Sequence, residues 1–108
     1  MKKQNKKSFP RGIRIAAKVQ TLVAEILRDN YSELNVTLAG AESHGGLRFV
    51  RLFWHGDKSL QKKLNEIAPT IRYQLAQVFD QKFVPELQFA YDDTLEKSMR
   101  IEKLLEGL

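Results

Sequence analysis

The sequence of 108 residues has no cysteine, only two histidines, and no apolar run long enough to span a membrane. The absence of cysteine excludes disulfides and thiolate metal sites, and it favours a reducing compartment such as the cytosol. Lys18 interrupts the apolar residues that begin at Ile15, so the continuous apolar core of a secretory signal is missing. We therefore expect a cytoplasmic protein without a membrane segment.

Side chains that commonly carry out catalysis are also scarce. His44 lies in an expected turn and His55 at the end of an expected strand, where histidines are usually exposed and structural. Asp92 and Asp93 stand directly before an expected helix, a position typical of helix capping. The pair Gly45-Gly46 suits a tight turn, because no strand-loop-helix glycine pattern surrounds it. We expect no enzymatic activity, no cofactor and no metal site.

Negative charge is missing from the first 24 residues, where Glu25 is the first acid to follow. The chain has 18 basic and 13 acidic residues and a net charge of +5, yet residues 25–108 carry a net charge of −2. This asymmetry favours a polyanionic partner, although a solvated tail that aids solubility is the alternative. The seven bases of the first 24 residues are Lys2, Lys3, Lys6, Lys7, Arg11, Arg14 and Lys18.

Hydrophobic periodicity predicts one α+β domain behind a basic flexible arm, residues 1–10. Apolar residues at helical spacing predict a first helix that begins near Ile13 and stops at Asn30. Residues rich in β-branched and aromatic side chains predict two strands within 34–42 and 47–55, which form a hairpin.

The second half of the chain has an apolar helical face that a proline interrupts. Because Pro69 removes a backbone donor and its ring clashes with the preceding turn, we expect two helical halves, 58–68 and 69–80, with a bend between them. Alternation over 87–91 predicts a third strand, and Asp93 with Glu96 predicts a capping box that starts a last helix. The expected order is α-β-β-α-kink-α-β-α, with a three-stranded sheet covered by helices.

The phenylalanines are assigned mainly to the core. Aromatic rings exposed on a sheet can stack on RNA bases, but a domain this small needs its large side chains for burial. Trp54 and Tyr73 are left open between the two roles. The residues assigned to packing are Phe49, Phe53, Phe79, Phe83 and Phe89.

The stretch FVPELQFAYDDTL, residues 83–95, resembles the C-terminal signature of the ribosome-binding factor A family, as do residues 98–101 and 104–105. Arg11 and Arg14, at the start of the first helix, are similar to that family's paired arginines. The element order is similar to its type-II KH-like architecture, and the resemblance covers residues 10–108. The signature residues are Val84, Pro85, Glu86, Leu87, Phe89, Asp92 and Arg100.

The resemblance implies a monomeric, non-catalytic assembly factor whose KH-like ribosome-binding domain occupies residues 11–108. Its partners would be the free small (30S) ribosomal subunit, the 16S rRNA and the precursor of that RNA, and its function would matter most in the cold. KH domains usually hold nucleic acid with a Gly-x-x-Gly loop, which this sequence lacks. The family has a kinked helix pair marked Ala-x-Gly instead, and here the matching triplet is Ala68-Pro69-Thr70. A second departure is Asp80, in a stretch that is usually more basic.

The sequence predicts RNA contacts from the arm, the first helix and the kinked helix pair. Two other interpretations remain: a generic KH-like RNA-binding module not dedicated to ribosomes, and a protein-interaction adaptor that uses its sheet or final helix. The predicted RNA-binding residues are Lys2, Lys3, Lys6, Lys7, Arg11, Arg14, Lys18, Lys62, Lys63, Arg72 and Lys82, with Ala68, Pro69 and Thr70 as the kink.

Overall fold

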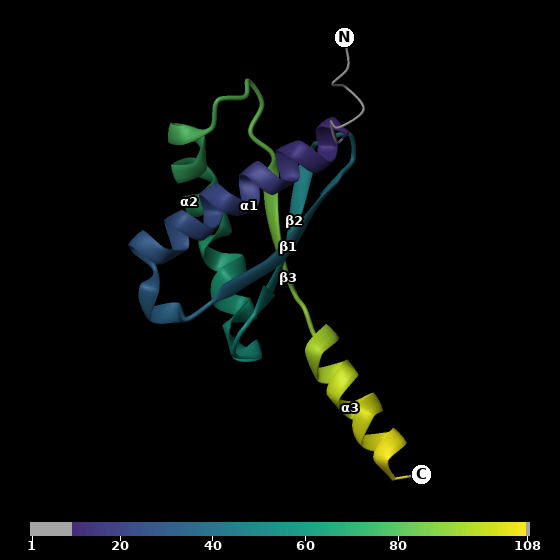
Figure 1. Cartoon of the computed structure of the whole chain (residues 1–108). Helices are drawn as coiled ribbons and strands as arrows, with labels where there is room; N and C mark the ends of the chain where they lie inside the picture. Colours follow the sequence, from purple (N-terminus) through teal and green to yellow (C-terminus); the bar gives the residue numbers. More distant parts are fainter. Residues whose placement is uncertain (1–9, 108) are drawn as a thin grey trace.

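The computed structural model describes residues 10–107, so all of the predicted arm except Pro10 lies outside the described residues. Two helices cover one face of a three-stranded sheet, and a third helix projects from the end of the last strand (Figure 1). The chain runs through α1 (Arg11–Asn30), η2 (Ser32–Leu34), β1 (Thr37–His44), β2 (Phe49–His55), η3 (Lys58–Leu60), α2 (Gln61–Val78), β3 (Glu86–Tyr91) and α3 (Thr94–Glu106).

The sheet has the order β1-β2-β3, which places β2 in the middle. β1 and β2 form the predicted antiparallel hairpin, and Gly45 and Gly46 occupy its turn with φ of 60° and 62°. β3 pairs parallel to β2, so α2 is the crossover between them. The first strand starts later than predicted, because Leu34 belongs to η2 and Asn35 adopts a left-handed conformation with φ of 55°.

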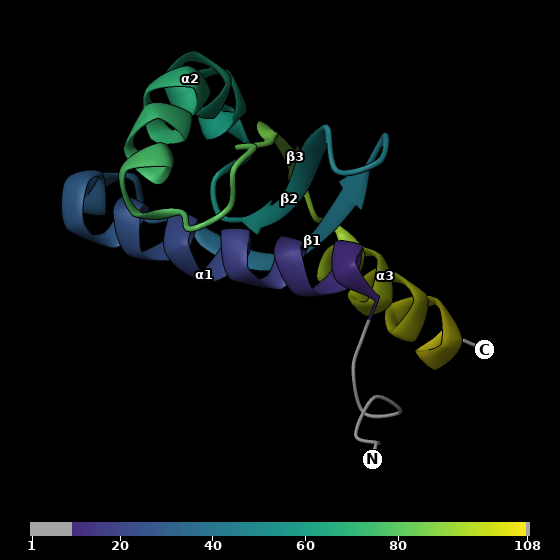
Figure 2. The same ribbon diagram turned by 90° about the horizontal axis from the view of Figure 1, so that it is seen from above.

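The core lies between the sheet and the two helices α1 and α2 (Figure 2). Val50, Leu52 and Trp54 alternate along β2 and are fully buried, which means that one face of the central strand points at the helices. Burial of each such side chain contributes about 1.5–3 kcal/mol. The helices supply Val19, Val23, Leu64, Ile71 and Leu75, all fully buried.

The assignment of most of the five phenylalanines to the core is wrong, because only two of these five are buried. Phe79 and Phe89 are buried, but Phe83 is 57% exposed in the loop after α2. Phe49 and Phe53 are only partly buried, because the alternation of β2 directs them to the sheet face opposite the helices.

Trp54 is a core residue, and its indole belongs to a hydrogen-bond network that connects β2, α2 and β3. Its Nε1 donates to Oε1 of Gln61 at 2.8 Å, at the start of α2. The same Gln61 amide donates through Nε2 to the carbonyl oxygen of Phe89 at 2.7 Å and to Oδ1 of Asn65 at 2.9 Å. One glutamine therefore fastens α2 to both β2 and β3.

The prediction of two separate helices, 58–68 and 69–80, is wrong, because α2 is one helix that contains Pro69. The proline ring is exposed, and the residue four positions earlier, Asn65, is exposed as well, so water can solvate the carbonyl that loses its donor. Ile67 and Ile71 are buried on either side of the proline and hold both halves against the sheet. The observed order of major elements is α-β-β-α-β-α.

The last helix departs from the sequence prediction at its start and in its packing. The side chain of Asp93, the N-cap residue, makes no capping hydrogen bond; it pairs with Lys97 at 3.4 Å instead. Oδ1 of Asp92 accepts from the backbone N–H of Thr94 at 3.0 Å. No described residue of α3 is buried, so only α1 and α2 cover the sheet (Figure 1).

We predict that Gln61→Leu lowers the free energy of unfolding by about 1–3 kcal/mol, because the buried indole N–H of Trp54 loses its acceptor. Urea unfolding measures the change. Gln77→Leu is the matched control, since Gln77 is an exposed glutamine of the same helix whose amide makes one long bond, 3.5 Å, to the carbonyl oxygen of Tyr73. Equal losses in the two variants would contradict a clamping function for Gln61.

Pro69→Ala should raise the free energy of unfolding, by up to about 3 kcal/mol, because alanine supplies the missing backbone donor in the middle of α2. Thr70→Ala, at the neighbouring exposed position, controls for helix propensity alone. A gain in Pro69→Ala no larger than in Thr70→Ala would show that the proline costs this helix nothing.

Candidate nucleic-acid interface

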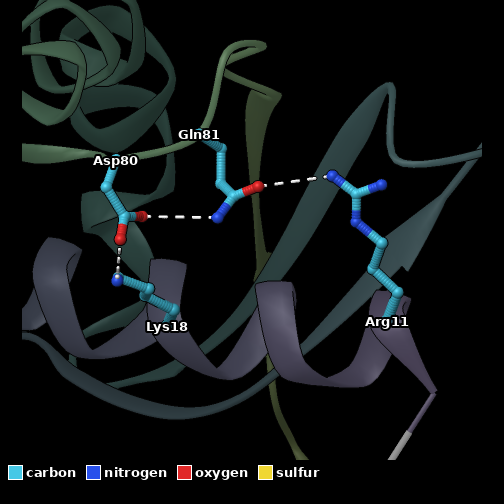
Figure 3. A network of polar contacts seen from close by, with 4 residues as sticks. All are labelled: Arg11, Lys18, Asp80 and Gln81. Carbon is cyan, nitrogen blue, oxygen red and sulfur yellow. Dashed lines mark hydrogen bonds and ion pairs between the residues drawn. The ribbon is translucent and has the colours of Figure 1, made fainter.

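A chain of polar contacts joins the start of α1 to the segment that follows α2 (Figure 3). Nη2 of Arg11 donates to Oε1 of Gln81 at 3.3 Å, and Nε2 of Gln81 donates to Oδ1 of Asp80 at 3.4 Å. Nζ of Lys18 contacts Oδ2 of Asp80 at 2.9 Å. Two of the predicted RNA-binding bases are thereby held beside residues 80–82.

Asp80 reduces the positive field of this region. The hydrogen bond from Lys18 is the main cause that holds the pKa of the Asp80 carboxyl below its ordinary value of 3.8, so the carboxylate is charged at neutral pH. Both side chains are largely exposed, and an exposed pair of this kind is weak and screened by salt. A polyanion that binds here competes with Asp80 for the ammonium group of Lys18.

The bases around this contact form one surface, which we call the α1 patch: Arg11, Arg14, Lys18 and Lys82. All four are exposed, three on the first two turns of α1 and one on the segment after α2. Pro10 directly precedes the patch, so the predicted arm with its four lysines joins the domain here.

The predicted bases of α2 do not belong to this patch. Lys62 and Lys63 are exposed in the first turn of α2, whereas Asp80 follows the other end of the helix. A rise of 1.5 Å per residue puts Lys63 roughly 23 Å from Val78 along the helix axis. The predicted RNA-binding residues therefore lie in separate places, and only the α1 patch brings several together.

Arg72 lies in a groove between α2 and β3. Its Nη2 donates to the carbonyl oxygen of Val84 at 2.7 Å, so the guanidinium bridges the helix and the segment before β3. A hollow of about 380 Å³ and one of about 330 Å³ share Pro69 and Arg72 in their walls. Tyr73 and Phe83 line the larger hollow and are exposed, while Ala68 lines the smaller one.

The signature residues have mainly structural functions. Pro85, Leu87 and Phe89 are buried, and Val84 packs against the core. Asp92 accepts hydrogen bonds from Thr94, which lower the pKa of its carboxyl. Glu86 on β3 and Arg100 on α3 are exposed.

Sequence reasoning missed three aromatic residues outside the core: Phe83, exposed in the groove, and Phe49 and Phe53, partly exposed on the sheet face opposite the helices. The signal for the last two was present, because Arg51 lies between them in the same alternation. A cation at the centre of a strand indicates which of its faces meets solvent. Phe83 has no comparable signal, since it lies in a loop.

Two classes of site have no support in residues 10–107. No cluster of three or more His, Asp or Glu side chains in this range is arranged to hold a metal ion. No helix within the same range has the length and apolar character needed to cross a membrane.

A solved structure shares this fold. The crystal structure of ribosome-binding factor A from Thermus thermophilus matches with a TM-score of 0.67, covering 76% of this chain and 97% of that one, at 11% sequence identity. With its parallel crossover through α2 and its two covering helices, the domain belongs to the α+β class with a KH-like fold.

The sequence comparisons give the family. The family model for ribosome-binding factor A matches residues 11–105. Relatives named ribosome-binding factor A include one from Methylobacillus flagellatus, 32% identical over 93% of this chain and 86% of the relative. Another, from Xanthomonas axonopodis pv. citri, is 34% identical over 94% of this chain and 85% of the relative. The chain belongs to the ribosome-binding factor A family.

Lys18→Ala should raise the pKa of Asp80 toward its ordinary value, because the Lys18 hydrogen bond is the largest cause of the lowering. NMR titration of the side-chain carboxyl measures this. A lowered native pKa stabilises the fold above the ordinary pKa, and this contribution is lost as the pH falls through the native pKa. Arg28→Ala is the control, since Arg28 is an exposed base of the same helix that pairs with Asp29 and has no contact with the Asp80 network. An unchanged pKa in Lys18→Ala would refute the assignment.

Proposed function

We propose that the protein is a cytoplasmic ribosome assembly factor that binds the free small (30S) ribosomal subunit as a monomer and assists maturation of the 16S rRNA precursor. Membership of the ribosome-binding factor A family over residues 11–105 carries this proposal. The relatives bear the name of a ribosome-binding protein, and nearly the whole chain aligns with them. The function requires binding and no catalytic turnover, and it would be most important for growth in the cold.

The α1 patch supports RNA as the surface that is recognised. Arginine and lysine bind phosphate oxygens without reading the sequence, and an array on a helix is already ordered before binding. Lys2, Lys3, Lys6 and Lys7 are four of the seven bases in the first 24 residues and precede this helix by a few residues. The patch and the arm together would follow the phosphates of ribosomal RNA.

Three further predicted contacts remain predictions of this proposal. Lys62 and Lys63 would reach phosphates apart from the α1 patch, at the other end of α2. Arg72 is engaged with the carbonyl oxygen of Val84, so its contribution would be to shape the groove beside Pro69. A generic RNA-binding module would use the same surfaces without preferring free small subunits.

One observation favours a second function, that of a protein-interaction adaptor. Ile101, Leu104 and Leu105 of α3 are more than half exposed and fall on one side of the helix at its 100° spacing. Exposed apolar side chains grouped in this way are typical of protein contacts. Such binding would depend little on salt, which separates it from contacts to phosphate.

Co-sedimentation in density gradients tests the proposal. We expect the full chain to migrate with free small subunits and not with whole ribosomes. Contacts to about six phosphates would give a slope of about −4 to −5 for the logarithm of affinity against that of salt. Deletion of the arm lysines, or Arg11→Ala with Arg14→Ala, should flatten the slope by about 0.7 per lost contact.

Lys103→Ala is the matched control, because Lys103 is an exposed base on α3, outside the patch and the arm. Its slope should equal that of the unchanged protein. Equal binding to whole ribosomes and to free small subunits would contradict the assembly function. A salt-dependence slope near zero would favour the protein-interaction adaptor. A slope unaffected by deletion of Lys2–Lys7 would leave the arm as a solubility tail.

A further inference from the structure

Within residues 10–107, no helix lies over the sheet face opposite α1 and α2, and we call this the open face (Figure 2). The central strand β2 presents four side chains there in alternation: Phe49, Arg51, Phe53 and His55, all partly exposed. Arg51 forms no ion pair with another described residue. Two aromatic rings with a cation between them therefore lie along the middle of this sheet face, and Glu42 on β1 is the residue opposite that cation.

Phe53 is flanked by the two smallest kinds of side chain. It lies opposite Gly40 on β1 and opposite Ala90 on β3. A Cβ atom added to Gly40 would lie 3.9 Å from Cδ2 of Phe53, in van der Waals contact with the ring. Because glycine has no such atom, no β1 side chain covers the phenyl ring from the directly opposite position.

Phe49 forms the wall of a hollow at the hairpin end of the open face. The ring stacks on His44 with centroids 5.3 Å apart and an interplanar angle of 17°. A hollow of about 320 Å³ is lined by Gly45, Arg48, Phe49 and Glu86. It combines an aromatic ring, a guanidinium donor and a carboxylate acceptor, the groups that contact the face and the edge of an unpaired nucleobase.

The other end of the face has a second arrangement of this kind. His55 stacks on Tyr91 at 5.9 Å and 26°, and Nζ of Lys58 lies 5.3 Å from the centroid of the Tyr91 ring. Cations thus stand at both ends of the face and in its centre, at Arg48, Arg51 and Lys58. Three acids lie near the face. Glu42 lies opposite Arg51 on β1 and contacts Nε2 of His44 at 3.2 Å, Glu86 lines the hollow, and Asp92 interacts electrostatically with His55.

We propose that the open face binds single-stranded RNA by stacking unpaired bases on Phe49 and Phe53, with Arg51 contacting a phosphate between them. Four residues of strand separate the rings by roughly 13 Å, which suits an extended strand of nucleotides. Rings that alternate with cations match the bases and phosphates that alternate along a nucleotide strand, so we take single-stranded RNA as the partner. The inference rests on the proposed function for its partner class, but it adds a surface distinct from the α1 patch.

Fluorescence anisotropy with a short labelled oligoadenylate tests this inference, and a duplex of equal length is the reference. Phe49→Leu and Phe53→Leu should each raise Kd for the single strand about five-fold or more, because leucine keeps apolar volume but cannot stack. Phe53→Tyr should retain binding, since it keeps the ring. Phe83→Leu, at an exposed phenylalanine in the groove, is the comparison for the loss of a ring outside the open face, and it should raise Kd less than either sheet variant. Urea unfolding confirms that each variant is folded.

The outcomes separate this inference from the proposed function. Unchanged affinity in both leucine variants, with loss in Arg11→Ala and Arg14→Ala, would overturn the open-face site and leave the α1 patch intact. An equal loss in Phe83→Leu would place the bases in the groove and also overturn it. A protein that co-sediments with small subunits but binds no single strand would do the same. Variants that change only self-association, seen by sedimentation equilibrium, would make the face an interface between copies.

Discussion

The burial of one side of β2 is the constraint on which the rest of the structure depends. Val50, Leu52 and Trp54 occupy the centre of the core, and they need helices over only one face of the sheet. Because β3 is parallel to β2, α2 must cross over that same face to connect them, and α1 fills the space over β1. The alternation that buries these three residues leaves Phe49, Arg51 and Phe53 on the other face. Core and open face are therefore two results of one strand pattern.

Most of the fold could be predicted from periodicity, and the parts that could not depend on tertiary contacts. The rule that proline ends a helix failed at Pro69, because buried Ile67 and Ile71 anchor the helix on both sides, while Asn65 and Pro69 lie on its exposed side. The capping rule failed at Asp93, where the neighbouring Asp92 supplies the oxygen. The phenylalanines were misassigned because the prediction considered only their size. A charged Arg51 on the same side of the strand indicates that this side is in contact with solvent.

The charged site was predictable in composition but not in arrangement. The sequence shows that the basic surplus lies at the start of the chain, and the structure places the described bases of that region on the first turns of α1. The sequence could not show that Asp80, which follows Lys18 by 62 residues, forms an ion pair with Lys18. Nor could it show that Lys62 and Lys63 lie at the far end of α2, since that separation follows from the unbroken helix.

The two surfaces would recognise different parts of a nucleic acid. The α1 patch carries point charges, and one of them, Lys18, is paired with Asp80. Such charges bind the phosphate backbone of both double-stranded and single-stranded nucleic acid, and their affinity falls as the salt concentration rises. The open face offers rings on a rigid sheet, and rings can be used only by bases that have left their pairs. A protein that combines the two would hold paired and unpaired RNA at once, so its affinity would be greatest for RNA that has not completed its folding. A preference for incompletely folded RNA is the property that an assembly factor needs, because the fully folded RNA then no longer binds the factor.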